Sequence, residues 1–198
     1  FKLVAKAFIK KLAFNDVLLG DASLNSRWVD DSLYLFSRAE IIYKGNYGEN
    51  RPLLLSGFYY PDRKEEQLDY SLELDNFKLE LLSEFLESFS SKVGGYVSGS
   101  IAIGGLAADP QLKGILKVQR AELKIDYLNT VYSFTDDIEI KPDGFWFNEI
   151  TLRDSTGNGA LCNGSIRHRG FSDFSIDLNL KPQQLACLNT GPRHNNVF

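Results

Sequence analysis

Residues that could carry out chemistry are few and widely spaced in this chain. His168 and His194 are the only histidines, and neither has cysteines or acidic residues near it at the spacing of metal ligands. No Gly-x-Ser-x-Gly motif marks a nucleophilic serine, and Gly99 and Gly104 lack the following helix and lysine of a phosphate-binding loop. The sequence therefore predicts no metal, no cofactor and no catalytic centre, and we expect that the protein is not an enzyme.

Two acidic stretches are better explained as turns than as sites. Residues 154–159 resemble the start of a calcium-binding loop, with aspartate first and glycine sixth. Thr156 and Ser165 stand at the third and twelfth positions, where that loop uses acidic or amide ligands, and the flanking segments are strand-like rather than helical. We expect a turn here, and likewise at Asp136-Asp137.

The two cysteines indicate little about function. Cys162 falls on the apolar side of its segment together with Ile166, where a thiol behaves as a small hydrophobic group. We expect both Cys162 and Cys187 to be buried free thiols. An oxidising compartment would permit a disulfide, which sequence alone cannot place.

Composition limits the classes of protein to which this chain can belong. Its 198 residues are 43% hydrophobic, enough to bury one core, and the net charge of −4 argues against a nucleic-acid partner. The sequence contains no run of eighteen or more apolar residues, which is the length that a membrane-spanning helix needs. The chain opens on Phe1 without the features of a signal peptide, so we expect an internal fragment of a longer protein.

The clearest secondary-structure signal lies between Val97 and Ile103. Apolar residues there alternate with serine and alanine, as in a strand with one buried face. Gly99 interrupts the apolar side, and a glycine in that position lets a strand bend, so it predicts a curved sheet. The same order of apolar residue, small polar residue and glycine recurs at residues 55–57 and 162–164.

The rest of the chain repeats this alternation in short segments separated by turn residues. Gly20-Asp21, Asp136-Asp137 and Asn148-Glu149 are among the expected turns. The apolar parity changes between Val118 and Ala121, which predicts a β-bulge. Roughly a dozen strands joined by tight turns predict an all-β, mostly antiparallel meander.

Two segments have helical periodicity. In residues 1–14 helical spacing slightly outweighs strand alternation and would make a basic helix suited to a membrane surface. In residues 78–92 apolar residues repeat at i, i+3, i+4 and i+7, and Asn76 and Gly94 could begin and end the helix. We expect this short amphipathic helix to lie on the sheet or across the end of its concave face. Its apolar stripe consists of Leu82, Phe85, Leu86 and Phe89.

Several phrases of the second half, taken in order, resemble the TamB/AsmA-like family. They are residues 97–101 (VSGSI) followed by Gly104-Gly105, residues 109–114 (DPQLKG), 128–132 (LNTVY), 154–159 (DSTGNG), 167–174 (RHRGFSDF) and 188–190 (LNT). The resemblance covers residues 68–198 well and residues 1–67 weakly. Ala107-Ala108 departs from the family pattern, in which the approach to the Asp-Pro turn is shorter.

The resemblance implies a long, mostly antiparallel curved sheet that forms an open apolar trough, often called a β-taco. Members of the family are anchored in the inner membrane of Gram-negative bacteria and span the periplasm. Their troughs are thought to carry phospholipid acyl chains between the two membranes, and TamB is also linked to the insertion of outer-membrane β-barrel proteins. We therefore expect residues 1–198 to be one β-trough segment of a longer periplasmic protein, with residues 1–9 as a strand.

The alternation predicts which side chains would line such a trough. We expect one set of apolar residues to share the concave face and to contact phospholipid acyl chains. That set is Val97, Ile101, Ile103, Leu116, Val118, Leu123, Ile125, Phe134, Ile138, Ile140, Phe145, Phe147, Ile166, Phe174, Ile176 and Leu178. An outer-membrane barrel-assembly protein is a second expected partner, and unpaired edge strands would let the isolated fragment associate edge to edge.

Two other functions remain open at this point. The chain could be an assembly factor that receives strands of a client barrel protein by strand addition. It could instead be a closed β-sandwich with a structural or adhesive role. A conduit requires an uncharged inner face along its whole length, whereas a sandwich requires a second sheet of equal area.

Overall fold

The computed structural model describes residues 4–14, 17–29, 33–45, 48–83, 90–170 and 172–189. They form one sheet of eleven strands in which the strand order follows the chain and every neighbouring pair is antiparallel. The predicted all-β antiparallel meander is therefore confirmed. The strands are β1 (Val4–Phe14), β2 (Val17–Val29), β3 (Tyr34–Gly45), β4 (Gly48–Tyr59), β5 (Leu68–Lys78), β6 (Ser90–Leu106), β7 (Asp109–Ile125), β8 (Thr130–Lys141), β9 (Gly144–Asp154), β10 (Gly159–Arg169) and β11 (Ser172–Gln183).

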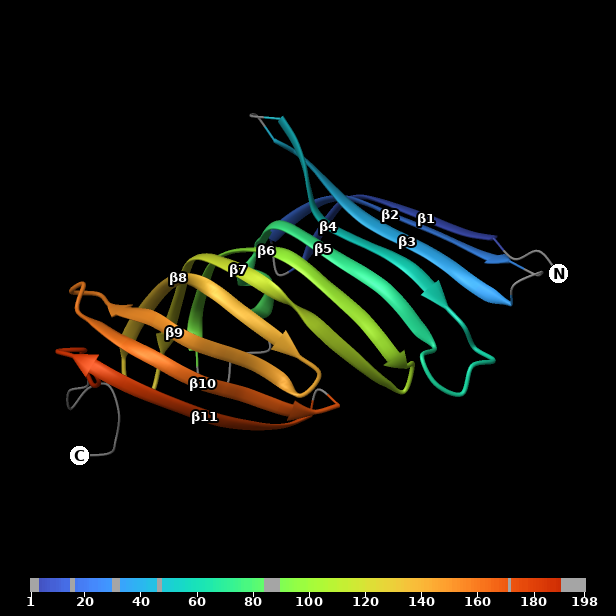
Figure 1. Ribbon diagram of the computed structural model, residues 1–198. Helices are drawn as coiled ribbons and strands as arrows, with labels where there is room; N and C mark the ends of the chain where they lie inside the picture. The colour runs from blue at the N-terminus through green and yellow to red at the C-terminus, as the bar shows by residue number, and fades with distance from the viewer. Residues whose placement is uncertain are drawn as a thin grey trace.

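The sheet is a single curved layer that forms an open trough (Figure 1). Its accessible surface is 13041 Å², against about 9,400 Å² expected for a compact monomer of 22.3 kDa. Each strand makes its main contacts with its neighbours in the sequence, so the described strands form no second layer. The open trough is confirmed, and the closed β-sandwich is wrong.

The basic segment at the start of the chain is a strand. Residues 4–14 form β1, which pairs along its length with β2. The helical interpretation is therefore wrong and the strand interpretation is right. Pairing with β2 satisfies the backbone of this segment, which outweighs a weak helical periodicity.

The predicted amphipathic helix does not span residues 78–92. Lys78 ends β5, a short 3₁₀-helix η2 covers Leu79–Leu82, and β6 begins at Ser90. Asn76 is a bulge within β5 and Gly94 lies inside β6, so neither residue caps a helix. Pairing of residues 90–94 with β7 extends the sheet into the predicted helix. Leu82, the first residue of the predicted apolar stripe, is the last residue of η2. The other three, Phe85, Leu86 and Phe89, lie outside the described residues.

Several expected turns are instead interior positions of long strands. Gly20-Asp21 lies in β2, Asp136-Asp137 lies in β8, and Asn148-Glu149 lies in β9. Polar and glycine residues at these positions accommodate irregular strand pairing rather than chain reversal. The strands are consequently longer than expected, and eleven of them suffice for the chain.

Bulges of one construction recur in four strands. In each, a residue adopts a left-handed conformation with φ between 50° and 54°, and its N–H donates to a side-chain oxygen of the next strand at 2.9 Å. Because a bulge adds a residue and increases local twist, these four bulges help to curve the sheet. The β7 bulge at Arg120 is the one predicted from the parity change, and it is confirmed. The donor and acceptor pairs are Lys11–Asp21, Asn76–Ser98, Arg120–Thr135 and Glu149–Asn163.

Two of the glycines on the apolar side allow neighbouring strands to approach closely. Gly99 has φ 150°, and a Cβ built on it would overlap the carbonyl oxygen of Ile115 on β7. Gly164 has φ 141°, and a Cβ there would overlap the carbonyl oxygen of Asp177 on β11. Only a residue without Cβ fits these positions, which explains the recurrence of glycine in the sequence.

The ladder between β8 and β9 is interrupted in the middle. Ser133 opposes Arg153, and the next opposed pair is Ile138 with Phe147. A hollow of about 560 Å³ lies at this interruption, and Arg120, Asp136 and other polar residues line it. This gap is the point at which the sheet is least continuous among the described strands.

Candidate functional site

The register of the sheet shows which face each side chain occupies, because directly opposed residues of an antiparallel pair project to the same side. Val97 opposes Val118 of β7, and Leu116 opposes Ile138 of β8. The same relation continues through β9, β10 and β11. We name this side of the sheet the trough face. It carries every predicted lining residue: Val97, Ile101, Ile103, Leu116, Val118, Leu123, Ile125, Phe134, Ile138, Ile140, Phe145, Phe147, Ile166, Phe174, Ile176 and Leu178.

Burial on the trough face is greatest in the middle of the sheet and least at its edge. Val118 and Ile101 are 3% and 7% exposed, whereas Ile176 on the edge strand β11 is 66% exposed. The cluster of Val97, Val118 and Ala121 is covered partly by Leu79 of η2. The apolar side chains of the trough face therefore become increasingly exposed to solvent toward β11.

The trough face also extends beyond the predicted set. Leu72 and Leu74 of β5 oppose Ile101 and Gly99 of β6, and Leu53 and Leu55 of β4 oppose them in turn. The alternation of apolar and polar residues in β5 could have predicted that Leu72 and Leu74 belong to this face. Toward the other end, Ile150, Cys162 and Leu180 oppose one another across β9, β10 and β11. Ile150 was harder to assign, because the bulge at Glu149 shifts the alternation by one residue.

The opposite side of the sheet, which we name the outer face, is polar over β5–β9. Ser98, Ser100 and Lys117 lie there, as do ion pairs between Lys92 and Glu122 at 2.8 Å and between Lys141 and Glu139 at 3.1 Å. These pairs are exposed and contribute little to stability. Over β5–β9 the sheet therefore has one mostly polar side and one mostly apolar side.

Polar groups interrupt the trough face at a few places. Asp136 opposes Val118 beside the β8–β9 gap, so the floor is not free of charge along its whole length. His168, near the end of β10, packs between Phe145 and Phe174 with ring centroids 6.0 and 5.9 Å away. Neither group stands among side chains arranged for proton transfer or nucleophilic attack.

Asp154 is the most highly connected polar group on the trough face. Its Oδ1 accepts hydrogen bonds from the Thr156 hydroxyl at 2.6 Å and from the N–H groups of Thr156 and Asn158. Its Oδ2 accepts the N–H of Ala186 at 2.8 Å. The Thr156 hydroxyl first, and then the Ala186 N–H, lower the pKa of Asp154 to about 2. Asp154 therefore orders the predicted turn at residues 155–158 and fastens the C-terminal segment.

The chemistry available in the described part of the chain is limited. No group of three or more His, Cys, Asp or Glu side chains there could hold a metal ion. Cys162 is a buried free thiol whose pKa is raised by burial, whereas Cys187 is exposed, so the expectation that both are buried is wrong for Cys187. Cys187 lies in an irregular segment after β11, where no strand covers it. The described residues contain no helix that is long and apolar enough to cross a membrane.

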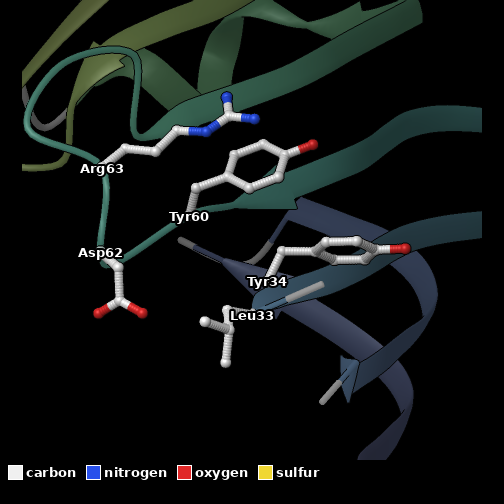
Figure 2. Close-up of a pocket in the computed structure, with 5 residues that line it drawn as sticks. All are labelled: Leu33, Tyr34, Tyr60, Asp62 and Arg63. Carbon is white, nitrogen blue, oxygen red and sulfur yellow. The ribbon is translucent and has the colours of Figure 1, made fainter. Parts of the chain in front are cut away.

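A second hollow lies on the outer face at the ends of β3 and β4 (Figure 2). It has a volume of about 420 Å³ and is lined by Leu33, Tyr34, Tyr60, Asp62 and Arg63. The Arg63 guanidinium stacks 3.5 Å from the centre of the Tyr60 ring, and the Asp62 carboxylate points away from it. The hollow brings together no nucleophile with a base, and its arginine already has an aromatic partner.

Comparison with known proteins does not place this chain in a family. No protein-family model, curated protein or solved structure matches it.

Proposed function

We propose that this chain is a non-enzymatic segment of a lipid conduit that shields phospholipid acyl chains from water. The observation that supports this proposal most strongly is the single-layer trough, whose one apolar face runs from strand to strand without a second sheet to cover it. An apolar face of this extent, opposite an outer face that is mostly polar over β5–β9, suits an apolar guest.

The proposed mechanism is passive. Each methylene group that leaves water for an apolar surface gains about 0.8 kcal/mol. An acyl chain would therefore be held against the more exposed trough-face side chains, such as Ile103, Phe147 and Ile176, while its polar headgroup would remain in solvent at the open side of the trough. No bond is made or broken, and movement along the trough exchanges one apolar contact for an equivalent one.

The resemblance to TamB/AsmA-like proteins supports the same proposal and suggests its setting. On that basis we place the chain in the periplasm, within a longer protein anchored in the inner membrane of a Gram-negative bacterium. An antiparallel sheet advances about 4.8 Å per strand, so eleven strands cover only about 50 Å. A conduit between two membranes would need further strands from flanking chain.

A second candidate function is the assembly of outer-membrane β-barrel proteins by strand addition. The observation that favours it is that β1 and β11 each have a neighbour on one side only. Unpaired edge N–H and C=O groups are templates for an incoming strand. The same edges would let isolated copies associate edge to edge, and sedimentation velocity tests that outcome.

Mass spectrometry of lipid extracted from the purified chain tests the conduit directly. We expect phospholipid to copurify with the chain, and to be lost from a variant with Ile103→Asp on the trough face. Ser100→Asp on the outer face is the matched control and should retain lipid. Equal lipid content in the two variants would contradict the proposal.

A further inference from the structure

After β11 the chain turns back across the rim of the trough face. Residues 185–189, which we name the strap, run from the end of β11 past the end of β9 to the turn between β7 and β8. Figure 1 shows that β11 ends at the same rim as the β9–β10 turn. Leu185 is buried, whereas Cys187 and Leu188 are exposed, so the strap inserts one side chain at its start.

The first half of the strap is held by two side chains that act on one residue. The N–H of Ala186 donates to Asp154 Oδ2 at 2.8 Å, and its carbonyl oxygen accepts the hydroxyl of Tyr132 at 2.8 Å. Tyr132 and Asp154 are directly opposed on β8 and β9. Tyr132 and Asp154 thus bond to both the N–H and the carbonyl oxygen of Ala186, as a neighbouring strand would in an antiparallel sheet.

The second half of the strap is held in the same way. The N–H of Asn189 donates to the carbonyl oxygen of Leu128 at 2.9 Å, and the carbonyl oxygen of Asn189 accepts the side-chain amide of Asn129 at 2.8 Å. The two clamped residues are three positions apart, a span of at most about 11 Å in extended chain. Each of these hydrogen bonds is made by the strap's backbone, so none of them depends on the identity of a strap side chain.

We propose that this rim is a peptide-binding site, formed by Leu128, Asn129, Tyr132 and Asp154, that reads the backbone of an extended segment and is occupied in cis by the strap. Its ligand class is a short extended peptide with an apolar residue at the Leu185 position and a residue with a free N–H at the Ala186 position. A peptide of this kind supplied in trans displaces the strap. The proposal does not depend on lipid transport.

Two features of the site support exchange of its occupant. The strap belongs to no strand or helix, and it buries one large side chain, so little apolar surface is exposed when it leaves. The Tyr132 hydroxyl and the Asp154 carboxylate remain fixed to the sheet, because they project from paired positions on β8 and β9. A vacated site would therefore keep its donor and acceptor in place for a second peptide.

Hydrogen exchange of the full chain tests occupancy in cis. We expect the amides of Ala186 and Asn189 to be protected, and Tyr132→Phe to increase the exchange rate of the Ala186 amide severalfold, because it removes one of the two bonds to that residue. Tyr127→Phe is the matched control, since Tyr127 lies in the turn between β7 and β8, close to Tyr132 in the sequence, and is 64% exposed. Unprotected amides in the unmodified chain would overturn the proposal.

Fluorescence anisotropy with a labelled peptide tests binding in trans. The peptide carries the sequence of residues 184–189 with serine in place of Cys187. We expect Leu185→Asp, which weakens the strap, to tighten peptide binding by about tenfold or more, because the competing occupant is removed. Adding Tyr132→Phe to that chain should weaken binding again, whereas adding Tyr127→Phe should not.

A second peptide tests whether binding depends on the backbone N–H at the Ala186 position. Proline at the Ala186 position removes the N–H that Asp154 accepts, so this peptide should not bind. Circular dichroism must show that the Leu185→Asp chain keeps its sheet, and the chain with Tyr132→Phe alone provides an independent measurement. Equal affinity of the two peptides, or equal affinity of the unmodified and Leu185→Asp chains, would overturn the proposal.

Discussion

The pair β3–β4 and the pair β8–β9 place most of their aromatic residues on opposite faces of the same sheet. On β3–β4 the rings of Tyr34, Phe36 and Phe58, together with Tyr60 just beyond β4, pack on the outer face, with centroids 5.2 to 6.2 Å apart. On β8–β9, Phe134, Phe145 and Phe147 lie on the trough face. Opposite the outer aromatic cluster, the trough face of β3 carries Ser37 and Ala39 between Leu35 and Ile41.

This difference indicates that the two parts of the sheet gain stability in different ways. The first part is held by an aromatic cluster on its outer face, and only the middle of β3 presents small side chains, Ser37 and Ala39, to the trough face. The second part uses its large side chains on the trough face, where they can also contact a guest. The proposed groove is therefore best developed from β5 to β10.

The largest effect is expected where burial and the proposed groove coincide. Ile101→Asp places a charge at a position that is 7% exposed. It should lower the free energy of unfolding by about 3–5 kcal/mol and abolish lipid copurification. Urea denaturation and lipid mass spectrometry measure the two effects. Ser100→Asp on the outer face is the control, and a comparable loss in that variant would contradict the assignment of faces.

A matched pair of phenylalanine substitutions tests the comparison between the two regions. Phe58→Ala and Phe147→Ala should each lower the free energy of unfolding by about 2 kcal/mol, because both rings are half-buried. Only Phe147→Ala should also reduce lipid binding. If Phe58→Ala reduces the amount of lipid equally, the outer cluster is part of the groove and the comparison fails.

Acid should release the strap through Asp154. Hydrogen bonds lower the pKa of this carboxyl from 3.8 to about 2. A lowered pKa means that its contribution to stability is fully present above pH 3.8 and is lost as the pH falls through about 2. Protection of the Ala186 amide, corrected for intrinsic exchange, should decline between pH 4 and pH 2. Asp154→Asn should remove this pH dependence, and an unchanged decline in that variant would assign it to another group.

The smallest effect is expected at the outer-face hollow. Arg63→Ala removes a cation–π contact at an exposed site and should lower the free energy of unfolding by about 0.5–1 kcal/mol. Arg63→Lys should recover part of that loss. Lipid binding should not change in either variant, and a change would make this hollow part of the functional surface.

The fold was largely predictable, because alternation has a direct meaning in a strand. Every second residue from Phe174 to Leu180 is apolar, and this pattern alone assigns one face. The bulge at Arg120 was predictable for the same reason, since it shifts the parity of the pattern. The bulges at Lys11 and Asn76 were not predicted, because Lys11 lies in a segment with competing helical periodicity and Asn76 was expected to begin a helix.

The remaining differences come from contacts that are distant in sequence. The stripe in residues 78–92 predicts a helix, but pairing with β7 extends β6 back to Ser90. Ala186 and Asn189 of the strap bond to Tyr132 and Asn129, which lie 54 and 60 residues earlier in the chain. A local sequence pattern cannot predict contacts over such separations. Asp154 was assigned to a turn, and its second role became evident only when Ala186 was placed beside it.

Photo-crosslinking in cells tests the central claim most directly. A crosslinking amino acid at Ile103 or Phe147 on the trough face should capture phospholipid, identified by mass spectrometry of the purified adduct. The same amino acid at Ser98 or Glu139 on the outer face should capture much less. Equal capture from the two faces, or none from the trough face, would contradict the account of this sheet as a lipid-binding trough.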